Sequence, residues 1–333
     1  MNLILYKWQP GWGLPSISAA CLEVEAYLRL AQAEVQVKEC SSAGAAPSGQ
    51  LPTLDTGAEV VSAAELDGGE AANAIISFLK SNGHDLDAQL DSAQKGLCVA
   101  FSALVHLRLR PATQYALWCE PSSFTQHTRA AFGAGLPVPI NYFQMWRQRR
   151  AVQQRFSTTS AEEVYADASA AYTALAAHLG KQATASNGAS TFFFGSQPSS
   201  LDALLFSHLA FHLSSPISPP QLQRKVAAHP ELVQFAESMM THVFTKPLPP
   251  APPVSSPEWA AQAEAASSST AAARAAVKAR LQRQQKEDSV RRQGRLWLAG
   301  VATLMIGYIL VTGQYISLAP GAYDDEEIEA EDD

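Results

Sequence analysis

Three things are scarce in this sequence of 333 residues: paired cysteines, excess positive charge and, over one long run, charge of either sign. The four cysteines stand far apart, so the sequence contains neither a CxxC zinc motif nor a dithiol redox motif. The net charge of -7 disfavours nucleic acid as a partner, because phosphate contacts need clustered lysine and arginine. Hydrophobic residues make up 47% of the chain, which excludes a chain dominated by disorder.

The run without charge covers residues 296–323, and its apolar part is 296–318. As a helix the apolar part would be about 35 Å long at ~1.5 Å per residue, enough to cross a hydrocarbon layer of ~30 Å. Trp297 and Tyr315 stand near its two ends, where aromatic rings prefer the membrane interface. The sequence therefore predicts a single transmembrane helix.

The charges on either side of this segment predict its orientation. Residues 274–295 hold eight basic residues against two acids, whereas residues 324–333 hold eight acids and no base. Arg291, Arg292 and Arg295 directly precede the apolar run, and such basic flanks favour the cytosolic side. We therefore expect a tail-anchored protein whose large N-terminal region faces the cytosol. The opening residues run into a strand pattern, so no secretory signal is expected.

Residue periodicity predicts a mixed α/β region followed by an all-helical one. Residues 3–6 and 35–37 are typical of strands, with a helix between them that starts after Ser16 as its N-cap. A hairpin that includes residues 59–62 and a helix over 70–80 should follow. Helical patterns then replace strands, at 91–110, 122–132, 140–154, 160–180, 200–213 and 231–243. The segment 201–213 is apolar all round, so we expect it to be the central buried helix.

Two motifs connect these elements to a known architecture. Pro52 stands just before the hairpin, where thioredoxin-type domains place a cis-proline, although an ordinary trans turn proline is the alternative. Ser199 and Asp202 form an S-x-x-D capping box at the start of the apolar helix, as at this place in glutathione transferases. Residues 229–235 also resemble the opening of a late helix in those proteins. The first ~80 residues thus resemble a thioredoxin-like domain, and the following helices resemble the helical half of a glutathione transferase.

With a C-terminal anchor added, the sequence resembles the metaxin family over residues 1–245. The phrases that carry the resemblance are Trp8, Gly11–Ser16, Cys21-Leu22 and Tyr27-Leu28, then Leu117-Trp118, Thr128-Arg129 and Leu136 to Asn141. The expected domains are thioredoxin-like over 1–82, all-helical over 83–245, Pro-rich linker and basic helical stalk over 246–295, transmembrane helix over 296–318 and acidic tail over 319–333.

The resemblance implies a subunit of the sorting and assembly machinery of the mitochondrial outer membrane. Its partners would be a β-barrel assembly protein, other subunits of that machinery, precursor proteins and the lipid bilayer, with no nucleic acid and no cofactor. An import receptor that binds precursors directly is an alternative. The acidic tail leaves the endoplasmic reticulum or a plastid envelope open, because mitochondrial tail anchors often end in basic residues.

The resemblance to glutathione transferases raises a second possibility, a tail-anchored transferase or peroxidase. Such an enzyme lowers the thiol pKa of glutathione with a hydroxyl or thiol at the start of the first helix. The sequence has Gly13-Leu14-Pro15 just before that helix, and its remaining candidates are Tyr6, Ser16, Pro52 and Ser62. Val61 stands before Ser62, where those enzymes carry an acid or amide. We therefore expect no enzyme activity and no catalytic residue.

Two further features of the sequence have structural explanations. His208 and His212 are four residues apart on the apolar helix, but no third metal ligand is placed beside them by the sequence, so we expect core histidines and no metal site. Cys21 falls within the apolar stripe of the first helix and is expected to be a core residue.

Overall fold

A computed structural model of the chain describes residues 3–63, 68–136, 138, 140–185 and 192–244. Residues Met1–Leu248 form one compact unit. The linker, stalk, transmembrane helix and tail that the sequence predicts after residue 245 lie outside the described residues, and with them Arg291, Arg292, Arg295, Trp297 and Tyr315. None of the helices in the described ranges is long and apolar enough to cross a membrane.

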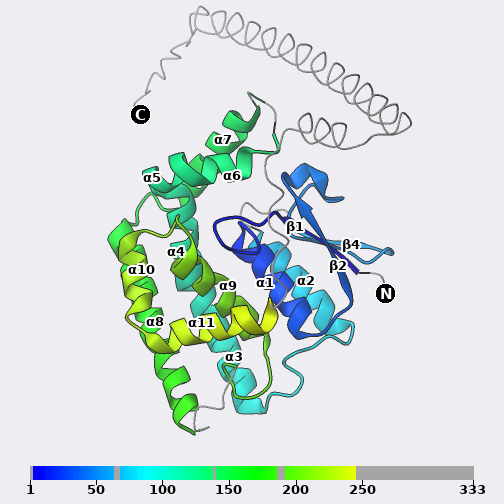
Figure 1. The fold of residues 1–333 in the computed structure, drawn as a ribbon, viewed down its shortest axis with the longest axis vertical. Coiled ribbons are helices and arrows are strands. Elements are labelled where there is room, and N and C mark those ends of the chain that lie inside the picture. Colours follow the sequence, from blue (N-terminus) through cyan, green and yellow to red (C-terminus); the bar gives the residue numbers. More distant parts are fainter. Residues whose placement is uncertain (1–2, 64–67, 137, 139, 186–191, 245–333) are drawn as a thin grey trace, which may run out of the picture. The chain divides into compact units, whose positions relative to one another are not determined.

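The N-terminal half is a four-stranded mixed sheet with the order β2-β1-β3-β4. Its strands are β1 (Leu3–Trp8), β2 (Val35–Cys40), β3 (Thr53–Asp55) and β4 (Val60–Val61). β1 and β2 run parallel, as the helix α1 (Ala19–Leu30) between them requires, and the β3–β4 hairpin pairs antiparallel to β1. α2 (Gly69–Ser81) follows the hairpin, so the predicted β-α-β, hairpin and helix order is confirmed (Figure 1).

The C-terminal half is helical, as predicted (Figure 1). A continuous helical run from Ser92 to Cys119 includes two π-helical stretches, and Pro111 lies between them. Proline has no N–H to donate, which breaks the regular helical bonding at that point. The helices and π-helical segments are α3 (Ser92–Leu104), η2 (Val105–Leu109), α4 (Arg110–Gln114), η3 (Tyr115–Cys119), α5 (Pro121–Ser123), η4 (Phe124–Thr128), α6 (Arg129–Gly133), α7 (Ile140–Arg155), α8 (Ala161–Ala185), α9 (Ser200–Ser214), α10 (Pro220–Ala227) and α11 (Pro230–Val243).

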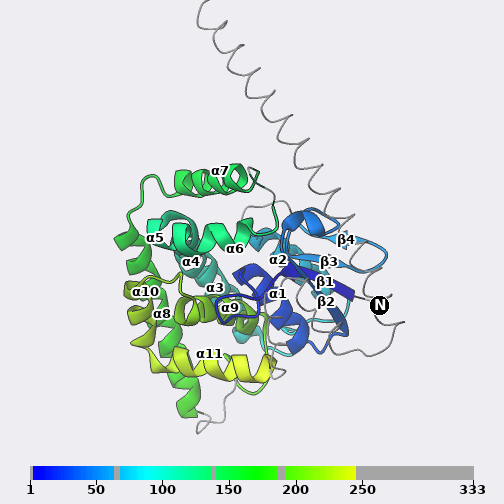
Figure 2. The same ribbon diagram turned by 45° about the horizontal axis from the view of Figure 1, so that its top comes forward.

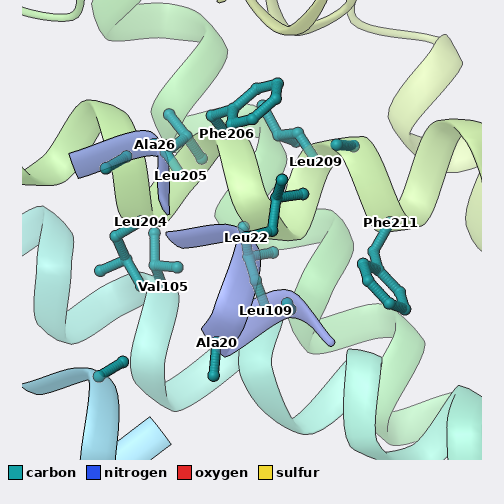
Figure 3. Packing of buried hydrophobic residues seen from close by; sticks show 14 of the residues in the cluster. Ala20, Leu22, Ala26, Val105, Leu109, Leu204, Leu205, Phe206, Leu209 and Phe211 are labelled. Carbon is teal, nitrogen blue, oxygen red and sulfur yellow. The ribbon is translucent and has the colours of Figure 1, made fainter. Parts of the chain in front are cut away.

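The helix α9 is central and buried on nearly all sides, which confirms the interpretation of segment 201–213. Figure 3 shows Leu22 and Ala26 of α1 among side chains of α9, including Leu205 and Leu209. Each fully buried leucine of this kind contributes about 1.5–3 kcal/mol relative to an exposed one. One continuous hydrophobic cluster therefore joins the sheet half to the helical half.

Two elements differ from the sequence prediction. The helix α10 has no counterpart among the predicted segments; its eight residues are too short to show a clear helical repeat, and only Leu222 and Val226 are buried. The first helix begins at Ala19 rather than directly after Ser16, because its N-cap is Ser18, whose backbone is extended. The residue before this N-cap is held beside the end of β1, since the N–H of Ile17 donates to the carbonyl oxygen of Gln9 at 3.1 Å.

Candidate functional site

A cavity of about 430 Å³ lies between the end of β1, the loop around residue 51 and the helical half. Its wall includes the aromatic rings of Trp8, Trp118 and Phe132, together with polar groups from α4 and α9 such as Thr113 and His208. A concave site with an apolar wall and a few convergent polar groups is typical of ligand pockets. The cavity borders the start of α1 and the loop around residue 51, the places that the resemblance to glutathione transferases implies for a glutathione-type site.

The start of α1 is the first test. Ser18, not Ser16, is the N-cap, since its Oγ accepts a hydrogen bond from the N–H of Cys21 at 3.4 Å. Ser16 is fully buried; its hydroxyl donates to the carbonyl oxygen of Trp8 at 3.0 Å and accepts from the N–H of Ser18 at 3.3 Å. Both hydroxyls near this helix start are thus engaged with the backbone. The prediction that Ser16 caps the helix was wrong.

The cis-proline loop is the second test. The Leu51–Pro52 peptide bond is cis, as expected from the position of Pro52. Ser62 donates its hydroxyl to the carbonyl oxygen of Pro52 at 3.0 Å, so it ties β4 to this loop. Gly68, at φ 79°, starts α2 so close to the loop that an added Cβ would lie 2.6 Å from the Leu51 carbonyl oxygen. Leu51 reaches the cavity wall, whereas Pro52 and Ser62 do not line it.

Tyr6 is the remaining candidate for glutathione chemistry. Its side chain packs beside Lys38 of β2, whose Nζ lies 3.5 Å from the phenol oxygen and 5.2 Å from the ring centroid. Tyr6 does not line the cavity either. The structure therefore brings Pro52 and Ser62 into contact, but none of the four candidates Tyr6, Ser16, Pro52 and Ser62 lines this cavity.

The cysteines offer no activated thiol. Burial raises the pKa of Cys21 and of Cys119 to about 11, and it also raises the pKa of Cys40 and Cys98. A catalytic cysteine needs a lowered pKa, because the thiolate is the nucleophile. Cys21 is fully buried in the first helix, as its place in the apolar stripe predicts.

A buried hydrogen-bonded chain crosses the helical half and ends at the cavity. The hydroxyl of Tyr172 lies 2.7 Å from Nδ1 of His212, whose Nε2 lies 2.9 Å from Oγ1 of Thr113. The same oxygen lies 2.8 Å from Nδ1 of His208 and donates to the carbonyl oxygen of Leu109. Because a hydroxyl donates one hydrogen and accepts two, Thr113 accepts from both rings and Tyr172 donates to His212.

This chain explains the two histidines without a metal. In the described part of the chain, no group of three or more His, Cys, Asp or Glu side chains is arranged to hold a metal ion. Thr113 and Tyr172 are the partners that sequence reasoning missed, because they come from helices far from α9 along the chain. The signal in the sequence is that two histidines lie on a largely apolar helix, where buried polar side chains need hydrogen-bond partners.

The buried position of His212 predicts a pH-dependent stability. Burial lowers its pKa to about 3, so between its ordinary pKa of ~6.5 and about 3 the unfolded chain binds a proton that the folded chain does not. The free energy of unfolding should therefore fall as pH falls below ~6.5, by up to ~1.4 kcal/mol per pH unit. Urea denaturation of the full chain in detergent at several pH values measures this slope.

The His212→Gln variant is the control for this prediction, because it lacks the titrating ring. It should lose less stability than the wild-type chain over the same acid range. Burial also raises the pKa of Asp202 to about 6. This shift makes the free energy of unfolding rise as pH falls below about 6, but it does so equally in both proteins. Equal slopes in the two proteins would contradict the assignment to His212.

The start of α9 holds the Ser199–Asp202 capping box that the sequence predicts. One oxygen of Asp202 accepts from the N–H of Phe193 at 2.7 Å. The other accepts from the N–H and hydroxyl of Ser199, at 2.8 and 2.6 Å. This fully buried carboxylate joins the chain before α9 to the helix itself, so its role is structural.

A buried ion pair is the largest feature that the sequence analysis missed. Nζ of Lys7, on β1, lies 2.7 Å from Oε2 of Glu25 on α1, and both side chains are almost fully buried. Lys7 also donates to the carbonyl oxygen of Pro15 at 2.6 Å. Arg29 binds the other oxygen of Glu25 at 2.7 Å and lies over the ring of Phe244. The pair holds the loop before α1 in place.

Comparison with known proteins gives two family matches. Residues 21–149 match the family Tom37, described as an outer mitochondrial membrane transport complex protein. Residues 168–239 match the C-terminal domain of glutathione S-transferases. The first match runs from within α1 into α7 and so includes parts of both halves, whereas the second lies within the helical half, from α8 to α11.

The chain is also similar to several curated proteins and solved structures. It is 29% identical to metaxin-1 of Macaca fascicularis over 252 residues, covering 72% of this chain and 74% of that protein. It is 30% identical to metaxin-2 of Mus musculus over 250 residues, covering 73% of this chain and 89% of that protein. A glutathione transferase from Phanerochaete chrysosporium is 13% identical with a TM-score of 0.49, covering 73% of this chain and 97% of that chain. Glutathione S-transferase III in apo form is 18% identical with a TM-score of 0.43, covering 76% of this chain and all of that chain.

Proposed function

The chain belongs to the metaxin family, and from that premise we propose that it is a non-catalytic protein of the mitochondrial outer membrane. In this proposal it docks on the β-barrel sorting and assembly machinery as a subunit and supports protein import. The family matched by residues 21–149 is described as a transport complex protein of that membrane, which supports the location and the role.

The observation that carries the non-catalytic part is the use of the hydroxyls at the start of α1. The Ser16 hydroxyl bonds to the Trp8 carbonyl oxygen, and Ser18 caps the helix. A transferase needs a side chain here that can turn toward the glutathione thiol and lower its pKa. Among the described residues, the cysteine pKa values are all raised, so no thiol replaces that function.

The mechanism that we propose is recruitment. The described unit presents the docking surfaces, and the segment 296–318 serves as a single-pass anchor with the N-terminal region in the cytosol. Linking a docking unit to the membrane raises the effective concentration of the partner, by as much as ~10²–10⁴ in overall avidity. The proposed order of parts is the one predicted from sequence: domains over 1–82 and 83–245, linker and stalk over 246–295, anchor, then the tail over 319–333.

The test is affinity purification of the tagged full chain from outer membranes solubilised in mild detergent. A β-barrel assembly protein should co-purify with the full chain, and its recovery should fall at least severalfold when residues 296–333 are removed. Recovery of the full chain as a monomer without any β-barrel protein would refute the proposal. Tyr6→Phe serves as the control variant, because Tyr6 is a candidate for glutathione chemistry. In a docking subunit this change should alter neither the recovery of the β-barrel protein nor glutathione conjugation, whereas in a transferase it should lower conjugation.

A further inference from the structure

The helix α7 has an outer face that the rest of the described unit leaves uncovered. In Figure 2 this helix lies at the edge of the helical half, beyond α5 and α6. It buries only Met145 and Val152, at 4% and 1% exposure. Large apolar side chains on the opposite face are exposed, with Phe143 at 61% and Trp146 at 54%. Contiguous exposed apolar surface of this kind marks an interaction site.

The stretch of sequence that includes this helix carries positive charge and no acidic residue. The stretch of sequence from Pro121 to Ala161 contains five arginines and no aspartate or glutamate, although the whole chain has a net charge of -7. Two of these arginines lie over exposed rings: Arg150 is 5.4 Å from the ring centroid of Trp146, and Arg129 is 5.5 Å from that of Tyr142. The apolar rings and the cationic groups therefore form one mixed surface.

A shallow groove of about 510 Å³ runs along this surface. Its wall is formed by Trp146, Arg149 and Arg150, with Gln153 and Gln154 beyond them. Arg149 is held from below, because it donates to the carbonyl oxygen of Trp118 at 3.1 Å and lies 4.3 Å from the ring centroid of Phe124. The groove thus has one fixed guanidinium and one at its exposed rim.

We propose that the outer surface formed by Tyr142, Phe143, Trp146 and Arg150 of α7, together with Arg129 of α6, docks on a bilayer that contains anionic phospholipids. The negative phosphates of phospholipids are electrostatically complementary to a basic surface that has no acidic residue. Tyrosine and tryptophan rings prefer the headgroup region of a bilayer. Phe143 then enters the edge of the acyl region while the guanidinium groups remain among the phosphates. The inference uses the membrane location in the proposed function, and it adds a second contact with that membrane beside the predicted anchor.

Charge decides between a lipid surface and a protein partner. A protein partner needs an acidic patch shaped to this one helix, whereas an anionic bilayer offers phosphates at every orientation of the helix. The arginines are spread over two helices, with Arg129 on α6 and Arg150 on α7, and each lies over an exposed ring of α7. An extended anionic surface fits that spread better than a compact epitope.

The experiment measures quenching of tryptophan fluorescence in the full chain by brominated lipid. The vesicles contain phosphatidylcholine alone or mixed with phosphatidylserine, and each protein is measured with Trp146 and with Trp146→Phe. The difference in quenching between the two proteins reports on Trp146, since the other tryptophans, including Trp297 in the predicted anchor, contribute equally to both signals. We expect strong quenching of Trp146 in the mixed vesicles and a severalfold loss in phosphatidylcholine alone.

Charge reversal supplies the matched comparison. Arg129→Glu with Arg150→Glu should reduce quenching of Trp146 severalfold, whereas Lys181→Glu with Arg224→Glu, which makes the same change of charge on α8 and α10, should leave it unchanged. Two results overturn the inference: no quenching of Trp146 in mixed vesicles, which would favour a protein partner, or quenching that is insensitive to the charge reversal at Arg129 and Arg150. Co-purification of the β-barrel protein with the same variants is scored separately, so failure of lipid docking and failure of the proposed function are distinguishable.

Discussion

Replacing Glu25 with leucine is expected to lower the free energy of unfolding by about 3–5 kcal/mol, because it removes the counter-ion of a buried lysine. Nζ of Lys7 lies 2.7 Å from Oε2 of Glu25, and the two side chains are 1% and 2% exposed. In the variant, the ammonium group keeps the carbonyl oxygen of Pro15 at 2.6 Å but faces an apolar side chain in place of the carboxylate. An unpaired buried charge costs far more than an ordinary lost hydrogen bond.

The single change at the other partner, Lys7→Met, should lower the free energy of unfolding by less. In Lys7→Met, Glu25 keeps Arg29, which donates from Nε at 3.0 Å and from Nη2 at 2.7 Å. Arg29 is 38% exposed, so the remaining pair stays in contact with water. The double variant Lys7→Met with Glu25→Leu should recover much of the loss, because an apolar pair in place of a buried ion pair is often neutral or stabilising.

Chemical denaturation of the full chain in detergent, followed by intrinsic tryptophan fluorescence, gives all four corners of this double-mutant cycle. The two single changes should be strongly non-additive. If Glu25→Leu changes stability by no more than about 0.5 kcal/mol, as a surface substitution does, then Glu25 is not the counter-ion of Lys7. Arg29→Met, which affects an exposed partner, should lie near that surface range.

The ion pair also connects distant parts of the unit. Lys7 belongs to β1 and Glu25 to α1, while Arg29 reaches the carbonyl oxygen of Val243 at 3.4 Å, at the end of α11. Loss of Glu25 should therefore loosen both the start of α1 and the end of α11.

Local signals predicted much of the fold. The apolar run in α9 and the three-residue spacing of its capping box are both visible within a few turns of one helix. The strand that begins at residue 35 and the helix that follows the hairpin are likewise local patterns, although the structure extends the strand to Cys40. These elements could be found because the residues that stabilise them are neighbours in sequence.

Contacts between distant segments were not predictable in the same way. The sequence predicted Ser16 as the N-cap. In the structure the Ser16 hydroxyl bonds to the Trp8 carbonyl oxygen, a contact that depends on how the loop folds back toward β1 and that no local pattern shows. Thr113 meets His208 and His212 across 95 and 99 residues, and no spacing rule reaches that far. Lys7 did leave a signal: it alternates with Leu3 and Leu5 on a buried strand face, and a buried lysine needs a counter-ion.

Replacing Asp202 with alanine is expected to lower the free energy of unfolding by about 3–5 kcal/mol, since each buried donor left without a partner costs about 1–3 kcal/mol. The carboxylate serves three donors at once: the N–H of Phe193, and the N–H and hydroxyl of Ser199. It is fully buried, so water cannot take its place without opening the start of α9. Chemical denaturation of the full chain measures the loss.

Two matched variants separate the carboxylate from the rest of the cap. Ser199→Ala removes a capping hydroxyl but leaves Asp202 bonded to both N–H groups, so it should cost about 1 kcal/mol. Asp202→Asn keeps the shape but directs an amide NH₂ toward one of the N–H donors, so it should cost about 2 kcal/mol. A cost for Asp202→Ala no larger than that for Ser199→Ala would mean that the carboxylate does not hold the segment before α9. The expected order of the three losses in free energy of unfolding follows from the number of hydrogen-bond donors that each variant leaves without an acceptor. Because the capping box is buried, water cannot replace the missing acceptor, so this number should determine whether the first turn of α9 stays folded.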